Sequence, residues 1–411
     1  MRDYTPINER FKDFVEVKDV VNFINSKSAK AKINTSAGLR NYCPAKKLKL
    51  TVNKEIAKTF VPEEYQDKIV DEIRWSLKGN GIYKNKLMVL DILAHFNWER
   101  PIYFAITVGR DNFMGLEKYF QLEGLAYRLV PYVAKSPDRQ TGIVNTHKMY
   151  DRLVTQFEWG GLNNPDLYFD ETNTRMVMNF RNNYSRLSEA LYQKGAKHVI
   201  KQFNNQITIE NTPLLAQKGV LDPKTGKIKQ NVFFQLSKQT IKEITQIIKL
   251  PAGSIDSAYV DSINLKALEV LDVCMAEFPR DVVNLSYFAL PIIDIYYKLG
   301  EVEKGNQVFV TMLDDYLTEI KYLKQFDKGS GLKRNKEITG EVLTSLGGIL
   351  QRHKLEDSDY SYSTKDDKYY KHLLADSKAV TITDTEIEDG IEIDYETYRI
   401  NTFMQEYLSI Q

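Results

Sequence analysis

The chain has 411 residues, 43% of them hydrophobic, which is enough for two or three domains with sizeable cores. Lysine and arginine together number 56 and aspartate and glutamate 55, so the formal net charge is +1. Nucleic-acid-binding proteins usually carry a basic excess or stripe, and we therefore expect no nucleic-acid partner. The longest apolar segment, residues 287–297, is shorter than the ~20 residues of a membrane span, so the polypeptide as given is expected to be soluble.

The first 160 residues alternate between strand and helix patterns. Residues 1–45 are expected to be an irregular lead-in with one helix, because apolar residues recur at helical spacing from Phe14 to Ile24. Residues 46–160 then form a small α/β domain, since alternating strands and helices are typical of a layered fold. The expected strands are 47–52, 102–108 and 125–130, and the expected helices are 62–77, 87–96, 116–121 and 147–157.

The remaining residues, 161–411, are predicted to be a mostly helical domain with an insertion at 198–262. Helices are expected at 182–194, 265–278, 336–351 and 395–408, with a further helix around 234–250 inside the insertion. Residues 380–393 alternate and favour a hairpin with Asp389-Gly390 as its turn. The predicted fold class is therefore α+β.

Residues 284–317 follow the register of a tetratricopeptide repeat, a helix pair joined by a glycine turn. Tyr296, Gly300, Gly305 and Phe309 have the expected spacings, although Leu317 stands where a terminal proline is typical. A split first copy is predicted upstream, with its first helix ending at Gly195 and its second helix carrying the remaining spacings. Those residues are Ala267, Leu271 and Pro279.

No sequence pattern predicts catalysis. The five histidines show no metal-ligand spacing, and the phosphate-binding and hydrolase motifs are missing. We therefore predict no catalytic residue, no metal and no cofactor.

Trp98, Arg100 and Tyr103 form the most unusual short cluster. Arg100 could clamp an anion and Trp98 could stack on a sugar, which makes the three residues a candidate ligand or partner surface. The structural alternative is that Trp98 fills a core while Glu99 and Arg100 form a turn before a buried strand.

Several segments also carry a family resemblance. They include NWERPIYFA (residues 97–105) and YFQLEGLAYRLVP (residues 119–131). These segments resemble the C-terminal region of bacterial protein O-mannosyltransferase-like membrane proteins, of the C-type glycosyltransferase superfamily. The resemblance covers most of residues 1–200 and again about 264–315. It implies an extramembrane module, on the periplasmic side of the inner membrane, whose parent chain would carry the lipid-linked-sugar site elsewhere.

The expected function is thus a non-catalytic module that docks a protein or glycan acceptor beside the membrane domain of its own parent chain. Two alternatives remain open at this stage. One is a purely structural cap of that membrane domain, and the other is a soluble glycan-active enzyme. Whether the parent protein is an enzyme is left uncertain.

Overall fold

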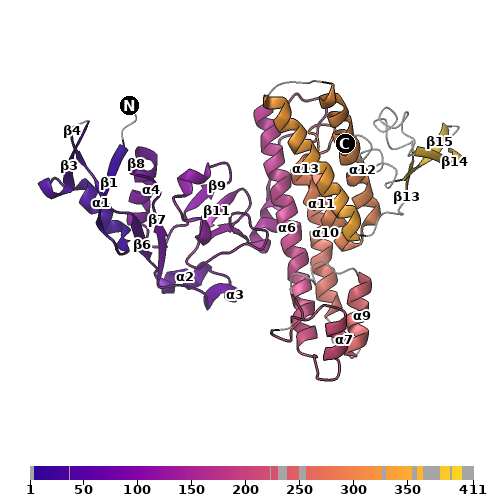
Figure 1. The fold of residues 1–411 in the computed structure, drawn as a ribbon, viewed down its shortest axis with the longest axis horizontal. Coiled ribbons are helices and arrows are strands. Elements are labelled where there is room, and N and C mark those ends of the chain that lie inside the picture. The colour runs from indigo at the N-terminus through magenta and orange to yellow at the C-terminus, as the bar shows by residue number, and fades with distance from the viewer. Residues whose placement is uncertain are drawn as a thin grey trace. The chain divides into compact units, whose positions relative to one another are not determined.

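The computed structural model describes residues 4–36, 38–222, 224–229, 238–249, 256–325, 330–353, 359–363, 380–388 and 391–399. The chain divides into two compact units, residues 1–157 (unit 1) and residues 158–411 (unit 2). Unit 1 is rich in strands, and unit 2 is built mainly from long helices (Figure 1). The predicted α+β fold class is confirmed.

Unit 1 contains four small sheets rather than one large one. A three-stranded sheet has the order β2-β6-β7, a second has the order β5-β1-β8, β3 and β4 form a hairpin, and a four-stranded sheet has the order β12-β10-β11-β9. The strands are β1 (Tyr4–Phe11), β2 (Val15–Glu16), β3 (Lys32–Thr35), β4 (Gly38–Asn41), β5 (Cys43–Ala45), β6 (Lys47–Thr51), β7 (Glu72–Ser76), β8 (Gly81–Tyr83), β9 (Tyr103–Ala105), β10 (Phe120–Leu122), β11 (Ala126–Leu129) and β12 (Ile143–Val144).

Short helices connect and cover these strands. They are α1 (Val17–Asn25), α2 (Lys54–Phe60), α3 (Glu63–Gln66), α4 (Lys84–Ala94) and α5 (Thr146–Tyr150), with 3₁₀ turns η1 (Ala29–Ala31), η2 (Arg110–Phe113) and η3 (Glu117–Tyr119) and a π-helical turn η4 (Asp151–Gln156). α1 buries Val17, Val20, Val21 and Ile24, the face predicted from their spacing. These residues share one apolar core with Leu48, Trp75 and Phe120, so side chains from three parts of the unit pack together.

Three segments of unit 1 differ from the prediction. The helix expected over 62–77 is only the short α3, followed by the strand β7, whose residues Ile73 and Trp75 are buried while Arg74 is exposed. The helix expected over 116–121 is a single 3₁₀ turn that leads directly into β10. Residues 1–45, expected as an irregular lead-in, contribute β1 to β5 and α1, which pack into the core described above.

Unit 2 contains long helices, a short helical insertion and a three-stranded sheet. The helices are α6 (Glu171–Asn204), α7 (Thr212–Gln217), α9 (Lys238–Ile248), α10 (Ser257–Glu277), α11 (Leu290–Leu299), α12 (Val302–Lys324) and α13 (Ser330–His353), with a 3₁₀ turn η5 (Tyr287–Ala289). The strands are β13 (Asp359–Ser363), β14 (Val380–Glu388) and β15 (Ile391–Arg399), in the order β13-β15-β14.

The long helices pack as consecutive pairs. α6 pairs with α10, α11 pairs with α12, and α13 packs against both α11 and α12 (Figure 1). α11 also contacts both α6 and α10, so it joins the first pair to the second. This neighbour-to-neighbour packing is the kind found in stacked helical repeats.

The segment between α6 and α10 has a small core of its own. Ile200 and Phe203 lie near the end of α6 and are buried in this core. They pack with Leu215 of α7, with Val220 in the segment after α7, and with Ile244 of α9. α6 continues for nine residues beyond Gly195, the predicted end of the helix, because these apolar side chains pack against the insertion.

The C-terminal predictions have mixed outcomes. β14 and β15 pair antiparallel from Glu388 and Ile391 outward, as expected for a hairpin, while the predicted turn at 389–390 lies outside the described residues. The helix predicted over 395–408 is wrong over residues 395–399, because these belong to β15 and pair with β13. The rest of that prediction lies outside the described residues.

A fully buried arginine holds the first helix pair together. Arg181 of α6 donates hydrogen bonds to the carbonyl oxygens of Phe278 (2.7 Å), Val283 (2.6 Å) and Asn284 (2.7 Å), and a longer one to Pro279 (3.3 Å). Burial lowers the pKa of Arg181 to about 10. The guanidinium therefore donates hydrogen bonds to carbonyl oxygens at and beyond the end of α10. Carbonyl groups at a helix end have no hydrogen-bond partner within their own helix.

An ionic network joins α6, α11 and α13. Asp294 of α11 accepts from His353 Nε2 at 2.8 Å and pairs with Lys298 Nζ at 2.8 Å, and Lys298 also reaches Glu189 of α6 at 3.0 Å. Burial alone would raise the pKa of Asp294, but the hydrogen bond from His353 and the charges of Lys298 and Arg352 lower it well below its usual range. The network therefore stabilises the ionised carboxylate between three helices.

Candidate functional site

The three residues of the predicted ligand surface have different environments. Trp98 is buried, with its indole Nε1 donating to the carbonyl oxygen of Thr51 at 2.9 Å and its ring against Phe96. Arg100 is exposed. The hydroxyl of Tyr103, on β9, donates to Glu123 Oε2 at 2.7 Å. Trp98 and Tyr103 thus have separate partners, and Tyr103 leads to a polar cluster that the sequence analysis did not include.

The centre of this cluster is Glu123, which lies in the turn between β10 and β11. The next residue, Gly124, has a φ of +79°, a conformation that glycine adopts without the steric cost of a Cβ atom. A Cβ at this position would also lie 3.2 Å from Cδ of Arg152. The Glu-Gly turn therefore lets Arg152 pack closely against the hairpin, and Arg152 Nη1 donates to the Glu123 carbonyl oxygen at 2.7 Å.

Three cationic side chains surround the Glu123 carboxylate, which is 0% exposed. Lys148 Nζ of α5 lies 3.1 Å from Oε1, Arg128 Nη1 of β11 lies 3.8 Å from Oε1, and Arg152 Nη1 of η4 lies 4.0 Å from Oε2. The Arg128 side chain is only 10% exposed and stacks over the ring of Phe60, with 4.2 Å from Cζ to the ring centroid. We call Glu123, Arg128, Lys148 and Arg152 the Glu123 cluster.

Neutral polar groups extend the cluster along the sheet. Asn145 caps α5 by accepting from the Lys148 backbone N–H at 3.1 Å, and its Nδ2 donates to Gln121 Oε1 at 3.2 Å. Gln121 in turn donates to the hydroxyl of Tyr132 at 2.8 Å. Burial and the hydrogen bond to Glu123 raise the pKa of Tyr103, so its hydroxyl stays protonated and remains a donor to the carboxylate.

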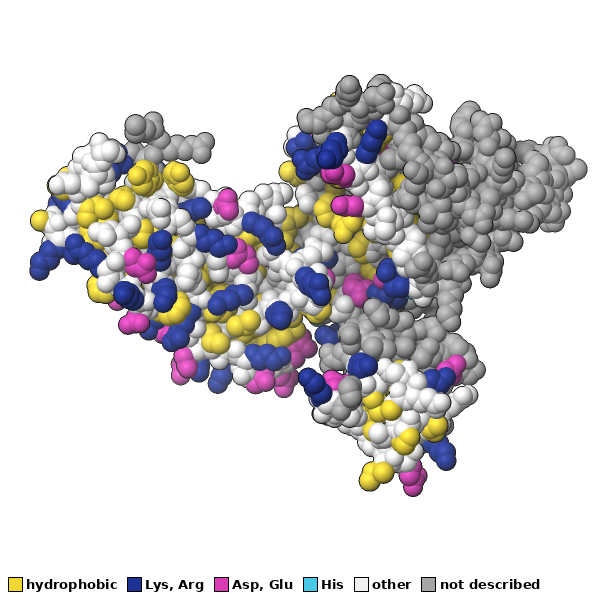
Figure 2. Space-filling model, in the orientation of Figure 1, with side chains coloured by type: hydrophobic (Ala, Val, Ile, Leu, Met, Phe, Trp, Pro, Cys, Tyr) yellow, Lys and Arg dark blue, Asp and Glu magenta, His cyan; other side chains and the backbone are white. Residues whose placement is uncertain are grey.

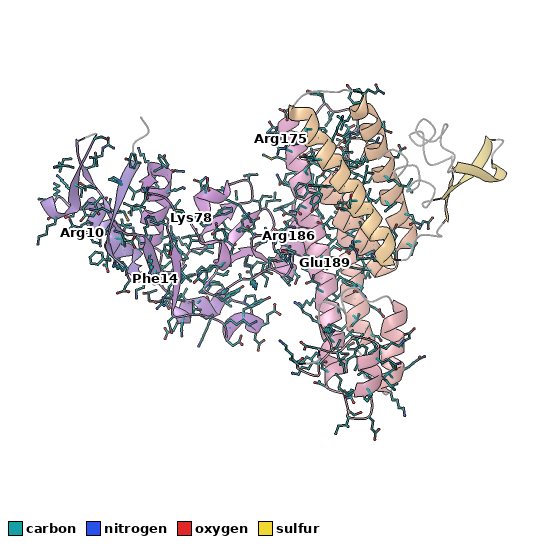
Figure 3. The ribbon with its side chains drawn as sticks, in the orientation of Figure 1. Arg10, Phe14, Lys78, Arg175, Arg186 and Glu189 are labelled. Carbon is teal, nitrogen blue, oxygen red and sulfur yellow. The ribbon has the colours of Figure 1, made fainter. Side chains whose placement is uncertain are left out.

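A groove of about 510 Å³ lies elsewhere in unit 1. It is lined by residues of the segment after β7, of β8, α4 and η2, of the segment after η2 and of η3, namely Leu77, Lys78, Gly81, Ile82, Lys86, Arg110, Asp111, Met114, Gly115 and Glu117. Lys78 is labelled in Figure 3. Lys and Arg side chains are scattered over the visible face of unit 1 rather than gathered in a stripe (Figure 2).

The residues of the predicted repeat register occupy the contacts between helices of unit 2. Ala267, Leu271 and Phe309 are each 0% exposed, and the hydroxyl of Tyr296 donates to Asp272 Oδ1 at 3.1 Å. Gly300 ends α11 in the left-handed conformation with a φ of +85°. Such a glycine at the end of a helix is the usual means of turning a helical hairpin.

Of the two helical glycines in the predicted register, Gly305 lies in a tight contact and Gly195 has room for a Cβ atom. A Cβ on Gly305 would lie 2.6 Å from Cε1 of Tyr297, and one on Gly195 would lie 3.5 Å from Oδ1 of Asn264 on α10. Pro279 follows α10 immediately after Phe278, and its carbonyl oxygen accepts from Arg181. These residues lie at helix ends and contacts.

Metal-binding groups and membrane-spanning helices are both absent from the described part of the chain. Within the described residues, no group of three or more His, Cys, Asp or Glu side chains is arranged to hold a metal ion. Among the helices of the described segments, none combines the length and apolarity needed to cross a bilayer.

Comparison with known families gives one match. Residues 1–148 match TMEM260-associated domain 2. The matched segment covers nearly all of unit 1, including Glu123, Arg128 and Lys148 of the Glu123 cluster, and it ends before Arg152. A search of curated proteins found no match, and neither did a search of solved structures.

The sequence contained one signal for the Glu123 cluster. Gln121 and Glu123 are polar residues in the otherwise apolar run FQLEGLAY, and both are buried in the structure. A buried polar group needs a hydrogen-bond partner, so their position in a strand pattern predicts a polar network. The identity of the partners could not be predicted, because Lys148 and Arg152 follow more than twenty residues later.

Proposed function

We propose that this chain is a non-catalytic module of a TMEM260-like protein, which docks a protein or glycan acceptor beside the membrane domain of its parent. The observation that carries the proposal is the match of residues 1–148 to the TMEM260-associated domain. The earlier resemblance to protein O-mannosyltransferase-like proteins supplies the transferase context and the periplasmic placement, both of which belong to the proposal.

The packing of unit 2 supports a scaffold role. The pairs α6/α10 and α11/α12 and the added helix α13 follow the neighbour-to-neighbour arrangement of helical repeats, whose stacked surfaces commonly bind partners. Gly300 and the buried Phe309 occupy the turn and contact positions that a tetratricopeptide repeat requires. We therefore propose that unit 2 is tetratricopeptide-like and supplies the docking surface.

Deletion in the native cells tests the docking role. The parent protein is compared with a version lacking residues 158–411, by blotting for abundance in separated membrane and soluble fractions and by measuring glycosylation of membrane and secreted proteins. Normal membrane abundance with loss of acceptor modification supports docking. Reduced abundance of the parent supports a structural cap instead. Sugar transfer from a lipid-linked donor by the 411-residue chain alone would overturn the non-catalytic proposal.

The size and placement of the parent can be checked in the same cells. An antibody against this chain should detect a membrane band much larger than 47.6 kDa. Cysteine residues introduced at exposed positions should react with a membrane-impermeant maleimide in intact spheroplasts if the module is periplasmic. A soluble band at 47.6 kDa would contradict the parental context.

The groove in unit 1 favours one alternative function. Asp111 and Glu117 both line it, and glycoside hydrolysis uses two carboxyl groups about 5–9.5 Å apart. If the chain is a glycan-active enzyme, hydrolysis of chromogenic glycosides should be detectable and should disappear in both Asp111→Asn and Glu117→Gln. Activity that survives both substitutions would contradict this role for the groove.

A further inference from the structure

The Glu123 cluster contains more positive than negative charge. Arg128, Lys148 and Arg152 are three cations, and within the described part of the chain Glu123 is the sole carboxylate within 4.0 Å of any of them. The cluster therefore carries two excess positive charges. Because partly buried charges of one sign are costly without partners, such a cluster favours an additional anion.

One of the cations is buried without adequate partners. The Arg128 residue is 8% exposed, and its Nε atom is buried with no hydrogen-bond partner. Its nearest carboxylate oxygen is 3.8 Å away, beyond hydrogen-bonding distance. An arginine guanidinium offers a fork of donors that suits the paired oxygens of a phosphate or carboxylate, so Arg128 has donor capacity that the protein leaves unused.

The other two cations connect the cluster to solvent. The side chains of Lys148 and Arg152 are 36% and 31% exposed, whereas the Glu123 side chain is fully covered. Arg152 also lies over the ring of Tyr103, with 5.8 Å between its Cζ and the ring centroid, and Tyr103 is itself 37% exposed. Lys148, Arg152 and Tyr103 are therefore accessible to a small anion from solvent.

We propose that Arg128, Lys148 and Arg152, oriented by Glu123, form a binding site for a phosphate monoester group. Two excess charges match a phosphate monoester, which carries about −1.5 to −2 near pH 7, better than a carboxylate with a single charge. Glu123 holds the three cations in place and bonds the hydroxyl of Tyr103, which forms one wall of the site. The site is independent of the docking role proposed above.

Calorimetric titration of the whole 411-residue chain with inorganic phosphate tests the proposal. We expect saturable binding at one site, and no saturable binding of chloride at equal ionic strength. Lys148→Gln and Arg152→Gln should each weaken phosphate binding at least tenfold, because each removes one charge from the site. Lys135→Gln, at an exposed position outside the cluster, should bind like the wild type.

A variant that is expected to bind phosphate more tightly separates an effect on binding from an effect on folding. Glu123→Gln keeps the size and acceptor oxygen of the side chain but removes the competing carboxylate, so it should bind phosphate more tightly than the wild type. A residue with a merely structural role would not produce that gain. Absence of saturable binding in the wild type, or equal affinities in Lys148→Gln, Arg152→Gln and Lys135→Gln, would overturn the proposal.

Vesicle sedimentation distinguishes a soluble phosphate ester from a lipid headgroup. The chain is mixed with phosphatidylcholine vesicles, with or without phosphatidic acid, and the same variants are compared. Sedimentation that depends on phosphatidic acid and on Lys148 would assign the site to a lipid phosphate. Phosphate binding in solution without such sedimentation would assign it to a soluble phosphate ester.

Discussion

Replacing Arg181 by methionine should destabilise the first helix pair of unit 2 substantially. The change removes three short hydrogen bonds, to Phe278, Val283 and Asn284, and hydrogen bonds to a charged group stabilise a protein by about 1.5–3 kcal/mol each. It also removes the cost of burying the guanidinium, which lowers its pKa from 12.5 to about 10 and corresponds to roughly 3 kcal/mol. The net loss in the free energy of unfolding is therefore about 2–6 kcal/mol.

Hydrogen exchange of backbone amides in α10 measures this loss where it occurs. A change of 1.4 kcal/mol corresponds to a factor of ten, so exchange of the protected α10 amides should accelerate by at least about 30-fold. Arg181→Lys keeps the charge but not the fork of donors, and should give an intermediate acceleration.

Arg175→Met is the matched control for this experiment. Arg175 lies on the same helix (Figure 3), but its side chain is 71% exposed and pairs with Glu171 one turn away. Its loss should change stability by less than about 0.5 kcal/mol. If α10 in Arg181→Met exchanged within about threefold of the wild type, the carbonyl contacts would not stabilise the helix pair and the reasoning would be wrong.

Three further predictions concern unit 2. Gly305→Ala should destabilise it by about 1–3 kcal/mol, because the new Cβ would lie 2.6 Å from Tyr297 Cε1; an unchanged urea midpoint would contradict this. Gly195→Ala should instead stabilise unit 2 by up to about 1 kcal/mol and raise that midpoint, since the nearest neighbour of the new Cβ is 3.5 Å away and alanine favours helix; a lower midpoint would show that the contact with α10 is tighter. The pKa of Asp294 is lowered, so its stabilising contribution is complete above its ordinary pKa of about 3.9 and is lost as the pH falls below it. Acid unfolding of Asp294→Asn, followed by circular dichroism, should therefore depend less on pH below about 4 than that of the wild type, and parallel curves would argue against the network with His353.

Features that depend on neighbouring residues in the sequence could be predicted. The glycine turn at Gly300 follows from the local need for a left-handed residue at a helix end, and the structure confirms it. The buried face of α1 follows from the spacing of its valines. By contrast, residues 62–77 are predicted to be one helix, whereas the segment with Ile73 and Trp75 forms the strand β7. Residues 72–76 alternate between buried and exposed side chains, and this pattern suits a strand. Pairing of β7 with β6 therefore decides the structure of this segment.

Features that depend on distant residues could not be predicted. Arg181 donates hydrogen bonds to carbonyl groups about a hundred positions later in the chain. Its position on a helix does not predict these partners. The Glu123 cluster likewise combines side chains from β10–β11, α5 and η4, whose proximity depends on how the four-stranded sheet closes. The polar residues Gln121 and Glu123 predict that partners exist, but not which cations they are.

The insertion between α6 and α10 also has a consequence for how unit 2 folds. α11 and α12 are separated only by Gly300 and Glu301, so their pairing is local, whereas α6 and α10 can pair only after the chain from Asn204 to Ser257 has closed into a loop. Loop closure costs conformational entropy that grows with length, and non-local pairing slows folding. The α11/α12 hairpin should therefore form early and present a template on which α6 and α10 assemble, with higher φ-values at Phe309 than at Ala267. In a stacked array of helices, the repeat that comes first in the sequence would then be among the last to fold.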